Sequence, residues 1–263
     1  MTNAIVPILC YHAIAPPPTL PARERGLTIP AERFDEHLNV LEELGLQTVT
    51  VSELIAARAS NDHAQLHGRV AITFDDGYAD LLSVVRPRLA SRSLTATAFV
   101  TTSYVDSREA GGADGRRWLS WSELRALEPI IEVGAHGHDH LQLDMIPVDV
   151  ARAEITTCKD LLERRLGRPV TSFAYPYGYS TPAVRALLPA VGYEAGLTVV
   201  HACSSPADDA FNLPRLRLTG RTTAATLRRW LSGDGVRIGP CPPQLRTRAF
   251  RVVRRARRAL RRA

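Results

Sequence analysis

Thr73-Phe74-Asp75-Asp76-Gly77 ends a run of strand-forming residues, Arg69–Phe74, with two adjacent carboxylates on a turn. Two like charges repel each other, and burying them at the end of a strand adds a cost of desolvation. A divalent cation bound there would relieve both. The simpler interpretation is that Asp75 and Asp76 cap a helix that starts near Tyr78, as aspartates before helices commonly do. This segment alone leaves both interpretations open.

A second segment favours the metal. Gly134–His140 follows a short apolar strand, Ile130–Val133, and holds three of the eight histidines of the chain. If the segment turns helically, His136 and His140 stand one turn apart on the same side, a spacing that lets two imidazoles bind one metal ion. With Asp76 they form a set of two nitrogen ligands and one oxygen ligand. Zinc suits this set, and iron, nickel, cobalt and manganese remain open.

Three segments in the order Thr73–Gly77, His136–His140 and Phe173–Gly178 carry a resemblance to a known family. The chain resembles the polysaccharide deacetylases of the NodB-like group, the family 4 carbohydrate esterases. The resemblance extends over most of the chain through four weaker matches: Cys10-Tyr11-His12, Thr97–Val100, Gly192-Tyr193 and Leu213-Pro214-Arg215.

The resemblance implies a role for each motif residue. Asp75 would be the catalytic base, and Asp76, His136 and His140 would bind a divalent metal, with zinc favoured. The backbone amide of Tyr177 would help to form the oxyanion hole. The implied reaction is metal-dependent hydrolysis of an N-acetyl group on an amino sugar of a glycan or glycan precursor, which releases acetate.

The sequence also departs from the family pattern. Ala174 stands where many members have an arginine that orients the base, and Gly137 follows the first metal histidine in place of serine or threonine. The Asp-Trp and Leu-x-His motifs, the second of which supplies the usual acid, have no counterpart. We take His201, which follows the apolar strand Gly196–Val200, as the first candidate for the acid and His12 as the second.

Apolar segments of strand length alternate with amphipathic helical segments, which predicts a parallel sheet with crossover helices. The expected elements are residues 6–12, 31–44, 47–50, 69–76, 79–90, 96–101, 121–128, 131–135, 147–166, 171–175, 182–191 and 195–200. The resemblance implies a distorted (β/α) barrel of about seven parallel strands with the site at their carboxyl ends. Ser120–Glu123 matches a capping box, Gly45 and Gly167 are expected helix stops, and Arg108–Arg117 is expected to be a loop.

The basic excess lies in one segment. The chain has 33 basic and 27 acidic residues, but residues 244–263 hold nine arginines and no acid, so the rest carries 24 against 27. We therefore divide the chain into a deacetylase barrel, 1–240, and an arginine-rich amphipathic tail, 241–263. On a helix, the alanines and valines of the tail face one side and most arginines the other, which suits an anionic membrane surface. A disordered solubilising tail remains an alternative, and we expect no nucleic-acid partner.

The four cysteines show no paired or metal-binding spacing, which indicates reduced thiols. The first residues lack the pattern of a signal peptide, and no apolar run is long enough to span a membrane. We therefore expect a cytoplasmic protein, peripheral on the inner face of the membrane, that acts on a lipid-linked glycan or a soluble N-acetylated oligosaccharide. Two alternatives remain: a deformylase or other amide hydrolase of the same fold, and a catalytically inactive carbohydrate-binding relative.

Overall fold

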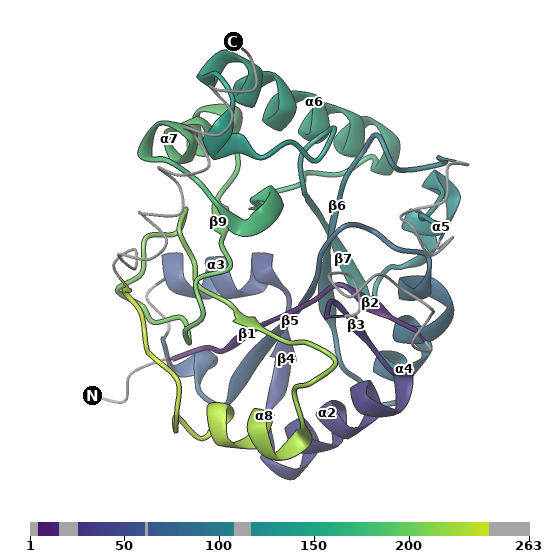
Figure 1. Cartoon of the computed structure of the whole chain (residues 1–263), viewed down its shortest axis with the longest axis vertical. Coiled ribbons are helices and arrows are strands. Elements are labelled where there is room, and N and C mark those ends of the chain that lie inside the picture. The colour runs from purple at the N-terminus through teal and green to yellow at the C-terminus, as the bar shows by residue number, and fades with distance from the viewer. Residues whose placement is uncertain (1–4, 16–25, 61–62, 108–116, 242–263) are drawn as a thin grey trace.

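A computed structural model describes residues 5–15, 26–60, 63–107 and 117–241 (Figure 1). Its strands are β1 (Ile8–Tyr11), β2 (Ala13–Ile14), β3 (Thr28–Ile29), β4 (Gln47–Val49), β5 (Arg69–Phe74), β6 (Ala96–Val100), β7 (Ile131–Ala135), β8 (Ser172–Ala174), β9 (Ala195–Leu197) and β10 (Leu216–Arg217). Its α-helices are α2 (Ala31–Glu43), α3 (Val51–Ala59), α4 (Arg86–Ala90), α5 (Trp121–Ala126), α6 (Val148–Leu166), α7 (Pro182–Val191) and α8 (Ala224–Leu231). The short helical turns are η1 (His63–Leu66), η2 (Leu81–Val85), η3 (Leu143–Met145) and η4 (Pro176–Gly178).

Seven parallel strands curl into a half-barrel in the order β10-β1-β5-β6-β7-β8-β9, and β4 pairs with the start of β5. The two ends of this sheet approach each other through an irregular segment, in which Leu213 bridges Leu197 and the Arg215 amide donates to the Val200 carbonyl at 3.0 Å. The expected distorted barrel of about seven strands is confirmed. Parallel strands place all their carboxyl ends at one end of the barrel, where ligands bind in such folds.

Side chains alternate between the two faces of the sheet. Leu9 and Tyr11 of β1 point outward into a large core shared with the surrounding helices, whereas Ile8 belongs to a smaller inner core. In that inner core Val51 and Leu54 of α3 pack against Ile8 and its neighbours. Helix α3 therefore fills the inside of the barrel at one end. The inward-facing positions nearer the carboxyl ends of the strands are left for polar side chains.

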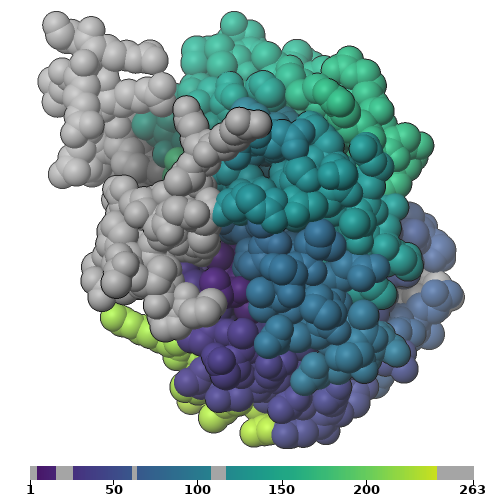
Figure 2. Space-filling view, turned by 90° about the vertical axis from the view of Figure 1, so that its right-hand side faces the viewer, coloured from purple at the N-terminus to yellow at the C-terminus, as the bar shows by residue number. Residues whose placement is uncertain are grey.

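The helices other than α3 form the outer layer. Helices α2 and α8 are neighbours, as are α6 and α7 (Figure 1). On one side of the molecule α2, the η2–α4 segment and α5 pack next to one another (Figure 2). Among the described helices, none is both long and apolar enough to cross a membrane.

Most expected boundaries agree with the structure. Ser120 caps α5 in a capping box with Glu123, and Gly45 and Gly167 adopt the left-handed backbone, with φ of 63° and 73°, where α2 and α6 end. The helix expected over residues 79–90 is formed by a π-helical turn, η2, over Leu81–Val85 followed by α4. All four cysteines are free thiols. The expected loop at 108–117 lies outside the described residues except for its last residue, and so does the tail at 242–263.

Helices α3 and α8 and the two-residue strands β2, β3 and β10 were not predicted. Helix α3 buries only Val51 and Leu54 and shows only a weak apolar period. Helix α8 does have an apolar face, formed by the buried Leu227 and the partly buried Trp230 and Leu231, a pattern that was not used to predict a helix. Strand β10 has two residues and forms only because it pairs with β1. Strands of only two residues therefore depend on tertiary contacts more than on local pattern.

Candidate active site

The site forms where β1, β5 and β7 end. Tyr11 of β1 pairs with Phe74 of β5, and the Asp75 amide donates to the Tyr11 carbonyl at 3.0 Å. The next residues in register, His12 and Asp75, therefore lie side by side at the end of the barrel. Asp76 follows at once.

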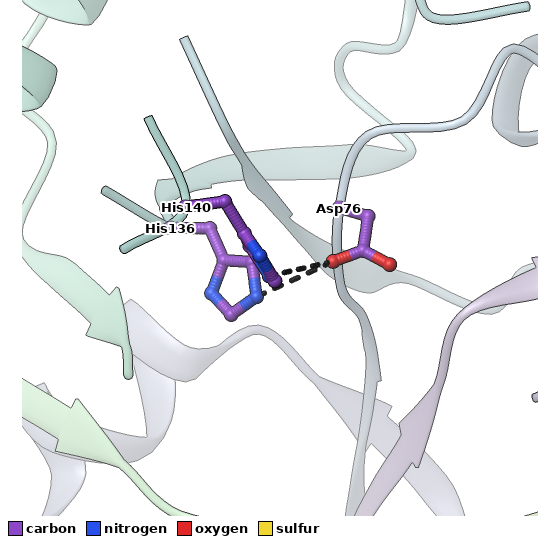
Figure 3. Close-up of side chains that lie close together, drawn as sticks. All are labelled: Asp76, His136 and His140. Atoms are coloured by element: carbon purple, nitrogen blue, oxygen red, sulfur yellow. Dashed lines mark ion pairs between the residues drawn. The ribbon is translucent and has the colours of Figure 1, made fainter. Parts of the chain in front are cut away.

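Asp76, His136 and His140 converge on one point (Figure 3). Asp76 Oδ1 lies 3.5 Å from His136 Nε2 and 3.3 Å from His140 Nε2, and one ligand atom of each residue lies within 4.8 Å of the others. Ligands around a tetrahedral zinc ion at about 2.0–2.2 Å are about 3.3–3.5 Å apart. Three protein ligands also leave a position free for water or substrate. The donor set and its spacing therefore fit a divalent metal.

A main-chain carbonyl orients the first histidine. His136 Nδ1 donates to the Ala174 carbonyl oxygen at 2.8 Å, so the hydrogen sits on Nδ1 and Nε2 keeps its lone pair for a ligand. Metal-binding histidines commonly have such a partner on the other ring nitrogen. Ala174, which stands where many family members have an arginine, thus orients His136 through its backbone carbonyl.

The segment from His136 to His140 is not a helical turn, so that expectation was wrong. Gly137 and His140 instead adopt φ of 82° and 55°, and these left-handed residues fold the loop back so that both imidazoles reach Asp76. Asp76 itself has φ of 77°. A left-handed backbone at a non-glycine residue costs about 1–3 kcal/mol and clusters at functional sites.

Asp75 is held by Arg215. Arg215 Nη1 and Nη2 donate to Asp75 Oδ1 and Oδ2, each at 2.7 Å, and both side chains are buried. Arg215 Nε donates to the Thr198 carbonyl at 2.9 Å, and Cys10 Sγ donates to Asp75 Oδ2 at 3.6 Å. The carboxylate therefore has one orientation, set by a planar two-point contact.

This ion pair explains the departure at Ala174. The sequence showed that the usual arginine was missing, and Leu213-Pro214-Arg215 matched the family only weakly, with no role assigned. The structure brings Arg215 to Asp75 across 140 residues of chain. A guanidinium therefore orients Asp75 from the irregular segment that precedes β10.

The site electrostatics favour ionised carboxylates. Burial is the largest single influence on the pKa of Asp75 and would raise it, but the charge and hydrogen bonds of Arg215, together with the nearby His136 and His12, lower that pKa below its usual value. Burial opposes ionisation of Asp76 as well, yet the imidazoles of His136 and His140 next to its carboxylate bring its pKa well below the usual range. Burial would lower the pKa of His136, but Asp75 and Asp76 raise it overall.

The two acid candidates lie in different surroundings. His12 interacts electrostatically with Asp75 and Asp76, its buried Nδ1 has no hydrogen-bond partner among the described residues, and burial lowers its pKa. His201 accepts a hydrogen bond from the Arg217 amide at 3.4 Å and packs against Trp230 with ring centroids 4.6 Å apart. Burial and nearby arginines lower the pKa of His201, and none of its described neighbours belongs to the site. The structure thus brings His12, and not His201, to Asp75.

Aromatic side chains flank His140. The Tyr177 ring lies 4.8 Å from the His140 ring on one side, and Tyr104, stacked on Trp118 at 4.5 Å, lies 6.1 Å away. Tyr177 is 55% exposed and has φ of 60°, a further strained residue at the site. The candidate ligands Asp76, His136 and His140 are therefore bordered by aromatic rings that a substrate would meet.

Comparisons with known proteins agree with this geometry. The sequence model of the polysaccharide deacetylase family matches residues 63–196, a segment that contains Asp75, the metal cluster and Tyr177. The chain belongs to the polysaccharide deacetylase family. This agrees with the resemblance to NodB-like family 4 carbohydrate esterases.

Individual relatives cover most of the chain. It is 25% identical over 217 residues to YxkH of Bacillus subtilis (strain 168), named as a candidate polysaccharide deacetylase, with 82% of this chain and 72% of YxkH aligned. The Streptococcus pyogenes deacetylase PplD, solved in complex with acetate, shares its fold with a TM-score of 0.75 and 25% identity over 86% of this chain and 97% of PplD. IcaB from Ammonifex degensii has the same fold, with a TM-score of 0.73 and 24% identity over 86% of this chain and 96% of IcaB.

The Arg215–Asp75 pair makes a testable energetic prediction. Arg215→Ala leaves a buried carboxylate without its partner, so we expect a loss of about 3–5 kcal/mol in the free energy of unfolding, measured by urea denaturation. Arg88→Ala, which breaks the surface pair of Arg88 with Asp35, is the control and should cost at most about 1 kcal/mol. Equal losses in the two variants would contradict the structural role of the buried pair.

Proposed function

We propose that this family member is a metal-dependent N-deacetylase that acts on an amino sugar of a glycan or glycan precursor. The single observation that carries the proposal is the separation of two adjacent aspartates. Asp75 is fixed by Arg215, whereas Asp76 faces His136 and His140. This arrangement supplies a carboxylate base beside a ligand set, which is what hydrolysis of an amide requires.

When bound by Asp76, His136 and His140, a divalent metal acts as a Lewis acid toward the amide carbonyl and lowers the pKa of water. Asp75 accepts the proton of the attacking water. Because its pKa is below the usual value, Asp75 is a weak base, so its function depends on water that has already been made more acidic. The Tyr177 backbone amide donates to the developing oxyanion.

His12 replaces His201 as our candidate for the acid that protonates the departing amine. It lies next to Asp75 in register, and its Nδ1 is not engaged by any described residue. Asp75 and Asp76 both favour the protonated ring and thereby counteract the effect of burial. The products are acetate and a free amino group on the sugar.

The acetyl group is favoured over other acyl groups by the likeness to PplD, whose structure holds acetate. The alternative of an inactive relative loses part of its support, because the missing arginine of the third motif is supplied by Arg215. A binding protein would have no need of an oriented base next to a ligand set.

The experiment that tests the proposal is an assay of zinc-loaded protein on N-acetylglucosamine oligomers, on lipid-linked saccharides and on an N-formyl sugar. Acetate and formate are quantified in the same samples. Release of acetate supports the proposal. Release of formate from an N-formyl sugar with no release of acetate would indicate the deformylase alternative instead.

We expect purified protein to bind about one equivalent of divalent metal. Replacing both His136 and His140 by alanine removes two of three ligands, so elemental analysis should show loss of the metal and the assay should show loss of turnover. His67→Ala, which changes a histidine outside the cluster, is the control. Equal metal content in the double variant and the control would place the ion elsewhere.

Substitution of the proposed acid and base should reduce turnover without loss of the metal, unlike substitution of the ligands. Asp75→Asn and His12→Gln should keep the metal and lose turnover by about 10²–10⁴-fold, the range typical for general acid–base groups. Metal content by elemental analysis and acetate release are measured on the same preparations. If Asp75→Asn kept its turnover, Asp75 would not be the base. If His12→Gln kept its turnover while Asp75→Asn lost it, His12 would not be the acid and another residue would have to protonate the amine.

The tail and the location of the protein remain proposals that rest on the sequence. Nine arginines within residues 244–263 favour contact with an anionic membrane on its cytoplasmic side, where a lipid-linked glycan would be in reach. The full chain should sediment with anionic vesicles at about 0.1 M salt and much less at about 1 M, because screening weakens the attraction. A chain that ends at Pro240 should not sediment. Equal binding to neutral vesicles would contradict the proposal.

A further inference from the structure

Glu154 is a buried carboxylate that does not belong to the ligand set or to the acid–base groups. It lies on α6 and is 5% exposed. Its Oε2 accepts hydrogen bonds from two successive backbone amides, those of His138 at 3.2 Å and Asp139 at 2.9 Å. Both amides lie between the two metal-binding histidines. A single side chain therefore contacts the middle of the loop that carries both imidazoles.

The same loop is held from the opposite side by backbone donors. The Thr102 amide donates to the Gly137 carbonyl at 3.2 Å, and the Ser103 amide donates to the His138 carbonyl at 3.0 Å. The loop carbonyls are thus bound to the segment after β6, while the loop amides are bound to α6 through Glu154. Without Glu154 only one of these two attachments remains.

The loop needs such support because its backbone is strained. Its left-handed residues, Gly137 and His140, turn the chain so that His140 faces Asp76. Strained conformations persist only where the surroundings over-determine them.

We propose that Glu154 is a positioning residue that sets the metal affinity of the site by fixing the loop between His136 and His140. The inference rests on the proposed metal-dependent function. Glu154 does not touch the ion. Its carboxylate keeps the two imidazoles at ligand separation before the ion arrives, so that binding costs less conformational freedom.

The helix offers a matched control. Glu163, also on α6, accepts from the Val170 amide at 2.9 Å and pairs with Lys159 at 2.8 Å, away from the metal cluster. Glu163→Ala therefore removes a carboxylate that binds the same kind of backbone donor on the same helix. It reports the cost of losing such a link without any change to the loop.

The test compares wild type, Glu154→Ala, Glu154→Gln and Glu163→Ala for zinc affinity, by competition with a chromophoric chelator, and for urea unfolding of the metal-free proteins. Glu154→Ala should weaken zinc binding by about 10–100-fold, the range seen when groups that support metal ligands are removed. Glu154→Gln keeps an oxygen acceptor and should lose less. Glu163→Ala should lower stability and leave zinc affinity within about twofold of wild type. With cobalt, the visible spectrum of Glu154→Ala should differ from that of wild type, because the ligand geometry changes.

Zinc affinity in Glu154→Ala equal to wild type, or reduced equally in Glu163→Ala, would overturn the inference and leave the proposed function intact. If Glu154→Ala does not fold, Glu154→Gln decides: unchanged affinity together with an unchanged cobalt spectrum overturns the inference. Absence of zinc binding by wild type would overturn the metal-dependent function itself, and the inference with it.

Discussion

The Asp75–Arg215 ion pair is the constraint on which the site depends. Two adjacent carboxylates would ordinarily compete for the same cation, and the chain resolves this by giving each a different partner. The guanidinium occupies both oxygens of Asp75, so that carboxylate is turned away from the ligand set, while Asp76 is left to face the two histidines. Burial makes the arrangement strict, because a buried carboxylate without its partner is strongly destabilising.

Strain and support occur together around this pair. Among the described non-glycine residues with positive φ, three of five, Asp76, His140 and Tyr177, belong to the site. Each is enclosed by fixed groups: the Arg215 pair next to Asp76, the Glu154 and Thr102–Ser103 contacts around His140, and the short η4 turn that carries Tyr177. The rest of the barrel provides the rigidity that these conformations require.

The sequence predicted the parts of the site that are local in the chain. Strands β5 and β7 are apolar runs that end in polar residues, so Asp75, Asp76 and His136 could be placed at strand ends. The geometry of the His136–His140 loop was predicted wrongly as a helical turn, because left-handed residues such as His140 leave little trace in sequence. The loop still brings both imidazoles to Asp76, but through left-handed residues and not through a helical turn.

Contacts between distant segments could not be predicted. Arg215 reaches Asp75 across 140 residues, and nothing near Leu213-Pro214-Arg215 indicates which acid it binds. His12 became the better acid candidate only through the register of β1 and β5, whereas His201 had followed an apolar strand as a catalytic residue would. Helix α3 was missed because its apolar period is weak, whereas α8 was missed although Leu227, Trp230 and Leu231 lie three and four residues apart on one face.

The central claim is that the two aspartates have different partners and different tasks. A crystal structure of the zinc-loaded chain, with anomalous scattering measured at the zinc absorption edge, tests it most directly. We expect one strong anomalous peak within about 2.0–2.2 Å of Asp76, His136 Nε2 and His140 Nε2, with Asp75 outside the ligand sphere and still paired with Arg215. A peak bound by Asp75, or an Asp75 carboxylate released from Arg215, would contradict it.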